Sequence, residues 1–241
     1  MNLLVDIGNT RLKWATSNGL SLVPGFATEN IDINRDTLTQ LWHSLTPPEQ
    51  LAISCVGAGR LIDLVTDVAK ERWPGIRLIR AKSVATAWGV SNAYSEPEKL
   101  GVDRWLGIIA AYNQYKKALC VVSCGTAITL DVVDAKGQHL GGMISPGLRL
   151  MKAALADNTE NLGLDENAYP FELAANTAAA IYNGTISAVC GLIEHALNVQ
   201  PDNLQLILTG GDAELIATQL PKLVSIDPDL VLRGLALTLT K

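Results

Sequence analysis

The chain opens with a short apolar strand, a tight turn and a second strand, and this unit constrains the fold more than any other stretch. Residues 3–7 (LLVDI) form an apolar run broken only by Asp6, which predicts a buried strand with a carboxylate near its end. Gly8 and Asn9 tolerate positive φ and therefore predict a hairpin turn. Residues 11–14 alternate polar and apolar side chains, as a strand with one solvated face does.

The turn that follows the first strand gathers polar groups around one small volume. Backbone N–H groups of a tight turn, with the side chains of Asn9 and Thr10, can surround phosphate oxygens. Asp6 can hold a divalent cation beside them and Lys13 adds positive charge, so the stretch suits a triphosphate with its Mg²⁺. An ordinary buried strand with an Asn-containing turn and a capping Asp explains the same residues, and this stretch alone does not decide between the two.

The second half of the chain begins as the first does. Residues 119–122 predict a buried strand, residues 123–126 a turn, and residues 127–133 an outgoing strand. Residues 5–9 (VDIGN) and 122–126 (VSCGT) share one order of residue types, which is apolar, polar, apolar, Gly and polar. Asp6 and Ser123 occupy the same position in this order. This correspondence, about half a chain length apart, indicates an internal duplication.

Strands and helices alternate through both halves, which predicts an α/β fold. We expect two units, residues 1–115 and 116–241, each a mixed sheet with helices on its faces, and a cleft between them. Gly57 and Gly59 open a helix after a strand, but the third glycine and the acidic strand end of a dinucleotide-binding motif are missing. The other expected strands are 21–33, 51–56, 76–79, 138–140 and 204–208, and the expected helices are 37–45, 61–68, 105–115, 148–156, 177–197, 213–220 and 230–239. Two further segments are expected to be a glycine-rich helix entry at 141–147 and a mobile loop at 157–172.

Composition and charge exclude several classes of function. Hydrophobic residues make up 48% of the chain and charged residues 18%, which is ample for a packed core. The net charge of −5 and the lack of a basic run argue against nucleic acid as a partner. No basic leader precedes the first strand, and no apolar stretch approaches the roughly 18–20 residues of a membrane span, so we expect a cytoplasmic protein without a membrane partner. The four cysteines form no CxxC pair, which predicts free thiols and no zinc site.

Four motifs extend the opening DIGNT of residues 6–10, namely GVDR at 101–104, GTAITLD at 125–131, GGMISPG at 141–147 and TGGD at 209–212. With them, the sequence resembles the type III pantothenate kinases nearly end to end. That family belongs to the superfamily of acetate and sugar kinases, heat-shock chaperones and actin. The resemblance implies two similar actin-like, or ribonuclease H-like, lobes with a nucleotide cleft between them.

The activity implied by the resemblance is ATP-dependent phosphorylation of pantothenate to 4'-phosphopantothenate, the first step of coenzyme A biosynthesis. The implied cofactors are Mg²⁺ and a monovalent cation, K⁺ or NH₄⁺, and the implied assembly is a homodimer. A family of regulatory accessory proteins carries the same motifs, so a nucleotide-binding regulator without kinase turnover is the alternative. A relative of the sugar kinases with another substrate is a third reading.

The resemblance also implies roles for individual residues. Asp103 is implied as the catalytic base, and Asp6 as the residue near Mg²⁺. The residues implied in ATP binding are Asp6, Ile7, Gly8, Asn9, Thr10, Arg11, Leu12, Lys13, Gly125, Thr126, Gly210 and Gly211. The residues implied in pantothenate binding are Tyr94, Gly101, Val102, Asp103, Arg104 and Thr177, the last of them across a dimer interface.

Ser123 departs from the pattern of the resembled family. That family usually has Asp at this position, and the carboxylate is associated with the monovalent cation. A hydroxyl is neutral and is a poorer partner for such an ion. We therefore expect that the ion binds elsewhere, that it binds more weakly, or that the requirement for it is lost.

Several of these residues also have a plain structural explanation. Asp103 could be the N-cap of the helix expected to start at Trp105, a role that is compatible with catalysis. Arg104 could be a solvated arginine, although a helix N-terminus disfavours a cation and its planar fork suits a substrate carboxylate. Tyr94 could be loop packing, and Thr177 could be a helix N-cap.

The remaining charged and titratable residues suggest no further site. Lys13 is most simply a solvated strand lysine, and its contact with phosphate rests on the resemblance. Asp131 and Asp212 look structural, as a strand-end residue and a helix cap. No histidine has a partner at the spacing of a catalytic triad, and none is assigned a role: His43, His139 and His195.

Overall fold

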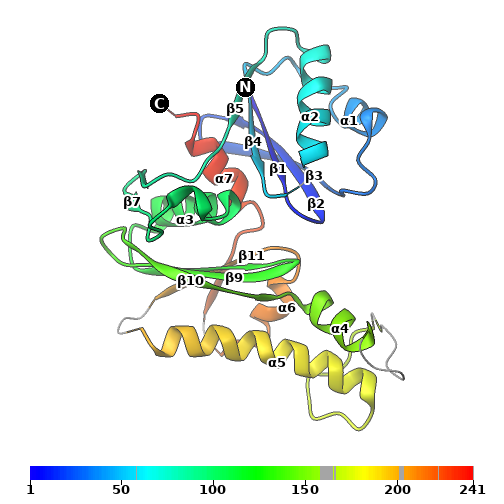
Figure 1. Cartoon of the computed structure of the whole chain (residues 1–241), viewed down its shortest axis with the longest axis vertical. Coiled ribbons are helices and arrows are strands. Elements are labelled where there is room, and N and C mark those ends of the chain that lie inside the picture. The colour runs from blue at the N-terminus through cyan, green and yellow to red at the C-terminus, as the bar shows by residue number, and fades with distance from the viewer. Residues whose placement is uncertain (58, 158–164, 166, 201–203, 222, 241) are drawn as a thin grey trace. The chain divides into compact units, whose positions relative to one another are not determined.

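The computed structural model describes residues 1–57, 59–157, 165, 167–200, 204–221 and 223–240. Within these ranges the chain forms two compact units, each built on a five-stranded mixed sheet (Figure 1). Unit 1 comprises Met1–Lys116 and Asp229–Lys241, and unit 2 comprises Lys117–Pro228. None of the helices in the described ranges is both long and apolar enough to cross a membrane.

Unit 1 is organised around its first strand, which lies at the centre of the strand order β3–β2–β1–β4–β5. The strands β1, β2 and β3 are antiparallel neighbours, whereas β1, β4 and β5 run parallel. The strands are Asn2–Ile7 (β1), Arg11–Asn18 (β2), Ser21–Glu29 (β3), Gln50–Cys55 (β4) and Arg77–Arg80 (β5), with a small separate hairpin of Thr86–Ala87 (β6) and Val90–Ser91 (β7). The helices are Arg35–Leu41 (α1), Gly59–Arg72 (α2), Val102–Tyr115 (α3) and Leu230–Leu237 (α7), with a 3₁₀ turn at Pro97–Lys99 (η1).

The two faces of this sheet are covered by different helices. Leu3, Val5 and Ile7 of β1 pack into a core with side chains of α1 and α2. Because successive side chains of a strand alternate between faces, Leu4 and Asp6 point to the opposite face. On that face α7 contacts β1, β2 and β4, and α3 contacts both β4 and α7. The alternation of the first strand therefore places the Asp6 carboxylate on the α3 side of the sheet.

The C-terminal helix α7 belongs to unit 1, so the expected assignment of residues 229–241 to the second half is wrong. Gly234 allows a close approach of two helix backbones, since a Cβ atom there would lie 2.3 Å from the carbonyl oxygen of Leu106 in α3. The buried residues of α7 complete the cover of the sheet. The position of a helix along the chain does not predict which apolar surface it will pack against. Here α7 packs mainly against α3.

Unit 2 repeats the architecture of unit 1 with the strand order β10–β9–β8–β11–β12. Again three strands are antiparallel neighbours and the last two run parallel to the central strand. The elements are Leu119–Cys124 (β8), Ala127–Val133 (β9), His139–Pro146 (β10), Leu148–Asp157 (α4), Thr177–Asn198 (α5), Gln205–Thr209 (β11), Ala213–Ala217 (α6) and Val224–Ile226 (β12). The helix α5 packs side chains such as Val189 and Ile193 on one face of the sheet (Figure 1). The shared strand order and directions agree with the internal duplication indicated by the sequence.

Several predicted boundaries differ from those of the structure. The stretch expected to be a glycine-rich helix entry at 141–147 is mostly strand, because a bulge between His139 and Gly141, with φ of 117° at the glycine, lets β10 continue to Pro146. The helix α5 is continuous from Thr177 to Asn198, one residue beyond its expected end. The strand β12 was not expected, and α6 ends at Ala217 rather than at 220. Residue 58 of the Gly57–Gly59 turn, and residues 158–164 and 166 of the expected loop, lie outside the described residues.

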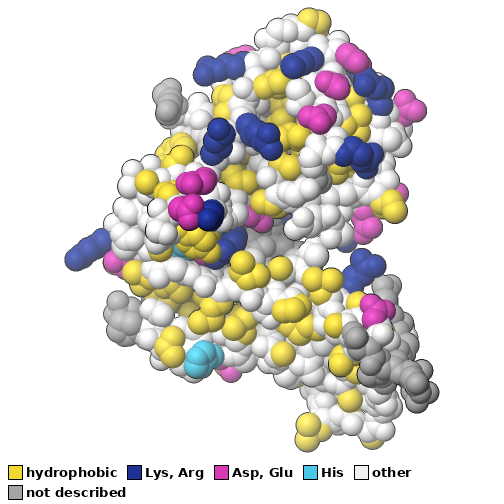
Figure 2. Space-filling view, in the orientation of Figure 1, with side chains coloured by type: hydrophobic (Ala, Val, Ile, Leu, Met, Phe, Trp, Pro, Cys, Tyr) yellow, Lys and Arg dark blue, Asp and Glu magenta, His cyan; other side chains and the backbone are white. Residues whose placement is uncertain are grey.

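The edge strand β10 carries exposed apolar side chains. Leu140 and Ile144 are 52% and 65% exposed, and Leu150 and Leu155 of the following helix α4 are 46% and 41% exposed. Figure 2 shows hydrophobic side chains gathered on the face of unit 2 where β10 lies. An apolar strand at a sheet edge offers both unpaired backbone groups and apolar surface to another chain.

Candidate active site

Three polar side chains lie in one row across the sheet of unit 1. Asp6 is directly opposite Lys13 on the antiparallel neighbour β2 and opposite Ser54 on the parallel neighbour β4. Side chains opposite one another in a sheet point to the same face, so the row faces the α3 side. The strand pairing thus explains why Asp6 and Lys13, seven positions apart, act on one another.

The Asp6 carboxyl has an unusual environment. Burial raises the pKa of Asp6 from 3.8 to about 7, the Ser54 hydroxyl lowers it, the Asp103 carboxylate raises it, and the Lys13 ammonium lowers it. The Ser54 hydroxyl is near enough to affect this pKa. Asp6 Oδ1 and Ser54 Oγ are nevertheless both buried without a well-formed hydrogen bond to any described residue. Asp6 as a whole residue is partly buried. A buried carboxylate oxygen without a donor is well suited to a cation.

The turn between β1 and β2 is held by backbone and side-chain hydrogen bonds. The Gly8 N–H donates to the carbonyl oxygen of Arg11 at 3.0 Å, which closes the hairpin. Asn30, just after β3, donates from its side-chain nitrogen to the carbonyl oxygens of Gly8 at 2.8 Å and Asn9 at 3.0 Å. Its own backbone N–H donates to the carbonyl oxygen of Thr10 at 2.8 Å. Asn30 was not expected from the sequence, because nothing local marks a residue that contacts a turn about 20 positions earlier.

Asp103 lies in the first turn of α3 and close enough to Asp6 to raise its pKa. The N-cap residue of this helix is Gly101, and Asp103 Oδ1 accepts a hydrogen bond from the N–H of Arg104 at 2.8 Å. The expectation that Asp103 caps a helix starting at Trp105 is therefore wrong in position, because α3 begins at Val102. Its carboxylate nonetheless takes one of the N–H groups at the helix N-terminus, where negative charge is favoured.

Arg104 is a buried cation that contacts Tyr94. Arg104 is only 8% exposed as a residue, so it is not the solvated arginine considered as an alternative. Its Nη1 donates to the Tyr94 hydroxyl at 3.1 Å, and its guanidinium carbon lies 5.9 Å from the centre of the Tyr94 ring. Asn92 shapes the loop that carries the tyrosine, accepting from the Tyr94 N–H at 3.0 Å and donating to the carbonyl oxygen of Pro97 at 3.3 Å. The predicted pantothenate residues of unit 1 thus include a contacting Arg–Tyr pair.

In unit 2, three glycine motifs meet at the end of the central strand β8. The Gly147 N–H donates to the carbonyl oxygen of Thr126 at 3.0 Å, and a Cβ at Gly147 would lie 2.1 Å from the carbonyl oxygen of Gly125. Gly210 has φ of 96°, and a Cβ there would lie 2.3 Å from the carbonyl oxygen of Cys124. The 125–126, 141–147 and 209–212 motifs are therefore parts of one backbone arrangement in which only glycine fits.

A family model for type III pantothenate kinases matches residues 2–198. The chain belongs to this family. It is 38% identical over 248 residues to the type III pantothenate kinase of Nitrosococcus oceani, covering 98% of this chain and 92% of that one. It is also 38% identical over 244 residues to that of Laribacter hongkongensis, covering 98% of this chain and 97% of the relative.

Solved structures show how widely the fold of this family is shared. A Campylobacter jejuni protein assigned to the Baf family of transcriptional activators matches with a TM-score of 0.62 at 22% identity, covering 96% of this chain and 94% of the other. Component A of (R)-2-hydroxyglutaryl-CoA dehydratase from Acidaminococcus fermentans matches with a TM-score of 0.54 at 10% identity, covering 98% and 94% of the two chains. At such low identity these likenesses concern the fold alone, which is the actin-like fold expected from the resemblance.

The position at which the type III pantothenate kinases usually have Asp is part of a row of hydroxyl side chains in this member. Ser123 on β8 lies opposite Thr129 on β9 and Thr209 on β11. This row corresponds to Lys13, Asp6 and Ser54 in unit 1, but none of its side chains is charged. Among the described residues, no group of three or more His, Cys, Asp or Glu side chains could hold a metal ion. The side chains in the row around Ser123 therefore offer neutral hydroxyl oxygens and no carboxylate.

Two other predicted assignments of this family member change in the structure. Thr177 is the first residue of α5 and is exposed, whereas the N-cap is Asn176, whose side chain accepts from the Ala179 N–H, so the N-cap alternative for Thr177 is wrong. His139 Nε2 lies 3.0 Å from Asp131 Oδ1, and both residues are buried, so this histidine has a partner that sequence spacing did not show. The pair joins β9 to the edge strand β10. It could be predicted from the sequence only if the pairing of these two strands were already known.

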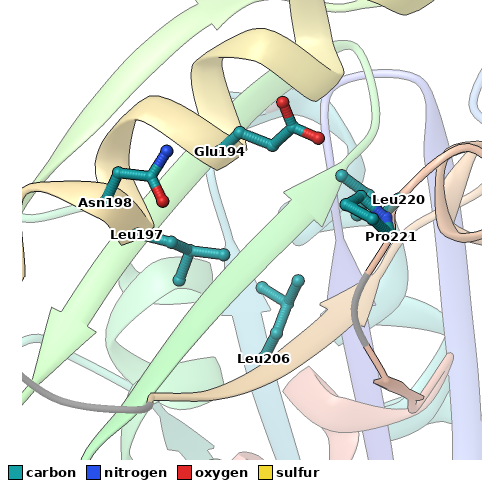
Figure 3. A pocket seen from close by; sticks show the side chains of 6 residues that line it. All are labelled: Glu194, Leu197, Asn198, Leu206, Leu220 and Pro221. Carbon is teal, nitrogen blue, oxygen red and sulfur yellow. The ribbon is translucent and has the colours of Figure 1, made fainter.

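The described cysteines and pockets suggest no additional chemistry. All four cysteines are free, and burial raises the pKa of Cys120 and Cys124 to about 12, so these thiols stay protonated near neutral pH. A pocket of about 270 Å³ lies between the end of α5 and β11 (Figure 3), and the sequence-predicted site residues do not line it. Its lining residues are Glu194, Leu197, Asn198, Leu206, Leu220 and Pro221.

Proposed function

We propose that the chain is an enzyme that transfers the γ-phosphoryl group of ATP to the primary hydroxyl of pantothenate. The products are 4'-phosphopantothenate and ADP, at the start of coenzyme A biosynthesis. The observation that carries this conclusion is membership of the type III pantothenate kinase family over nearly the whole chain. Asp6 and Asp103, the acidic residues that the chemistry needs, are both present, and they act on one another electrostatically within unit 1.

Asp103 is proposed as the base that receives the proton of the pantothenate hydroxyl. A carboxylate is a weak base, so most of the acceleration comes from holding the hydroxyl in line with the phosphoryl group and from electrostatic stabilisation. The hydrogen bond from the Arg104 N–H fixes one oxygen of the carboxylate and orients the other. Asp103 is placed by the start of α3, so its position depends on helix packing and not on a mobile side-chain rotamer alone.

Arg104 and Tyr94 are proposed to recognise pantothenate. A guanidinium presents a planar fork of donors that matches a carboxylate, and pantothenate carries one carboxylate. The contact with the Tyr94 hydroxyl and ring holds Arg104 in a buried position, where a cation gains from pairing with an anion. Gly101 and Val102 bring the backbone at the start of α3 to the same site. Thr177, which belongs to unit 2, keeps its proposed contact with pantothenate on the basis of the family resemblance only.

The nucleotide is proposed to bind through the glycine turns. The β1–β2 turn of unit 1, residues 8–11 with Lys13, contacts phosphates, as do Gly125 and Thr126 in unit 2, and Gly210 and Gly211 lie near adenosine. Asp6 has a buried oxygen that no residue in the described part of the chain donates to, and so it fits the position of a group that holds Mg²⁺. When bound, Mg²⁺ supplies positive charge that neutralises the phosphates during transfer.

This chain has no carboxylate at the position where the resemblance implies a ligand of the monovalent cation. The row of Ser123, Thr129 and Thr209 supplies neutral hydroxyl oxygens only. Asp131, two residues beyond Thr129 on the same strand face, is already hydrogen-bonded to His139. We therefore propose that activity does not depend on K⁺ or NH₄⁺ bound at this position.

The chain is further proposed to act as a homodimer. The support is the edge strand β10, which exposes Leu140 and Ile144 and has no neighbour on its outer side among the described strands. A second copy that covers this surface would bury apolar area and satisfy backbone groups at once.

An assay of ADP release tests the proposed activity against the alternatives. The protein is incubated with ATP and Mg²⁺, with and without pantothenate, and with glucose or N-acetylglucosamine as other alcohols. The kinase proposal expects ADP release only with pantothenate. Binding of ATP without turnover of any alcohol would instead support the regulatory alternative, and turnover of a sugar alone would support a sugar-kinase relative.

A further inference from the structure

Asn30 makes an unusual set of contacts with the turn between β1 and β2. Its side-chain nitrogen donates to the carbonyl oxygens of Gly8 and Asn9 at 2.8 and 3.0 Å, and its backbone N–H donates to that of Thr10 at 2.8 Å. One residue therefore binds three consecutive carbonyl groups of the turn. We propose that Asn30 is a positioning residue that orients the N–H groups of this turn toward the phosphates of ATP, an inference that rests on the proposed kinase function.

The orientation follows from the geometry of the peptide bond. In a planar trans peptide the carbonyl oxygen and the N–H of the next residue point in opposite directions, and the described chain has no cis peptide. Carbonyl groups of residues 8, 9 and 10 that point to Asn30 therefore direct the N–H groups of residues 9, 10 and 11 away from it. Successive N–H groups that face one side of a turn form a concave site for an anion. Asn30 holds this arrangement before the nucleotide arrives.

The chemistry of the contact selects an amide side chain. Both side-chain contacts of Asn30 are carbonyl oxygens, so the NH₂ group must face the turn, and it uses its two hydrogens on them. A hydroxyl has one hydrogen to donate and a carboxylate has none. The Asn30 Oδ1 atom is buried and has no hydrogen-bond partner among the described residues. An unpaired buried acceptor lowers the stability of the fold. The presence of Asn at position 30 is therefore better explained by its contacts to the turn than by fold stability alone.

The turn is also held from a second side, by the segment that follows β4. The Val56 N–H donates to the carbonyl oxygen of Ile7 at 3.1 Å, just before the turn. A Cβ at Gly57 would lie 2.8 Å from the Asn9 side-chain oxygen, so this glycine leaves room for the Asn9 side chain. The strands β1 and β2 pair along their length without help from Asn30. Loss of the Asn30 side chain should therefore loosen the turn while the sheet persists.

The test compares Asn30→Ala and Asn30→Asp with Asn34→Ala as a matched control. Asn34 follows in the same connection and caps α1 by accepting from the Thr37 N–H at 2.9 Å, so its loss should lower thermal stability without reaching the turn. For Asn30→Ala we expect the KM for ATP to rise about tenfold or more, with the KM for pantothenate changed less than about twofold. Asn30→Asp should be worse, because it replaces a donor by a negative charge. Asn34→Ala should leave both KM values unchanged.

Direct binding of ATP separates this inference from the proposed function. Equilibrium binding of Mg-ATP is measured for the wild type and for all three variants, beside their unfolding temperatures. If the wild type binds ATP but does not phosphorylate pantothenate, the proposed function fails, and the binding data still decide the role of Asn30. An ATP affinity of Asn30→Ala within about twofold of the wild type would overturn the inference. Failure of both Asn30 variants to fold would also overturn it, because the residue would then be structural.

Discussion

Replacing Asp6 by Asn should stabilise the metal-free protein while it abolishes most of its activity. Asp6 Oδ1 is buried without a hydrogen-bond partner among the described residues, and burial raises the pKa of this carboxyl from 3.8 to about 7. The native state without metal therefore pays a penalty for the ionised form, and Asn is a neutral side chain of the same shape. A site built to hold a cation is expected to be unstable when the cation is absent.

The magnitude and sign follow from the two pKa values. A pKa of 3.8 in the unfolded chain and of about 7 in the native state corresponds to roughly 4 kcal/mol at about 1.4 kcal/mol per pH unit. Below pH 4 both states hold the proton and Asp6 has no effect. Between pH 4 and 7 only the unfolded chain ionises, so the free energy of unfolding falls as pH rises, and above pH 7 the loss is constant. Because Asp6 as a whole residue is only partly buried, we expect a gain of roughly 2–4 kcal/mol for Asp6→Asn at pH 8.

Urea unfolding in EDTA, at several pH values between 5 and 8.5, measures this effect. The difference between Asp6→Asn and wild type should widen by about 1 kcal/mol per pH unit up to pH 7 and then level off. Asp63→Asn, which changes an exposed carboxylate on α2, serves as the control and should leave the pH dependence as it is. Parallel curves for wild type and Asp6→Asn would refute the reasoning that Asp6 is a destabilising buried acid.

Three further changes test the other parts of the proposal. Asp103→Asn should lower kcat by about 10²–10⁴-fold, while circular dichroism melting changes little, because the amide oxygen can still accept from the Arg104 N–H; an unchanged kcat would dismiss the base. Wild-type kcat should be the same within about twofold in NaCl, KCl and NH₄Cl at equal ionic strength, whereas Ser123→Asp should gain a rise in unfolding temperature specific to KCl. A strict K⁺ requirement in the wild type would contradict this. Ile144→Lys should shift a dimer toward monomer in light scattering, and an unaltered mass would exclude β10 from the interface.

The sequence predicted the strand–turn–strand units and the duplication well because both are local patterns. Residues 3–7 and 119–122 are apolar runs that form buried strands, and the turn after each of them contains a glycine. Boundaries that depend on packing were less predictable. The helix α3 starts at Val102 instead of Trp105, and β10 continues through its glycines because β9 pairs with it.

Long-range partnerships were beyond the sequence for a physical reason. The contact of Asn30 with the first turn, the pair of Asp131 with His139, and the packing of α7 on α3 each depend on which elements become neighbours in the fold. The motifs identified the candidate residues, but the strand register explains why the Lys13 charge acts on Asp6, and the packing of α3 on the sheet explains why the Asp103 charge does. Assigning roles to the site residues therefore requires both the family motifs and the three-dimensional structure.

The central claim is transfer of the γ-phosphoryl group of ATP to the primary hydroxyl of pantothenate with Asp103 as base. Phosphorus NMR of a reaction with ATP, Mg²⁺ and pantothenate observes the new phosphate ester directly. Our account predicts one phosphomonoester signal, coupled to the methylene protons next to that hydroxyl, that grows as ADP appears and is almost absent with Asp103→Asn. ADP and inorganic phosphate without the ester, or an ester formed equally well by Asp103→Asn, would contradict it.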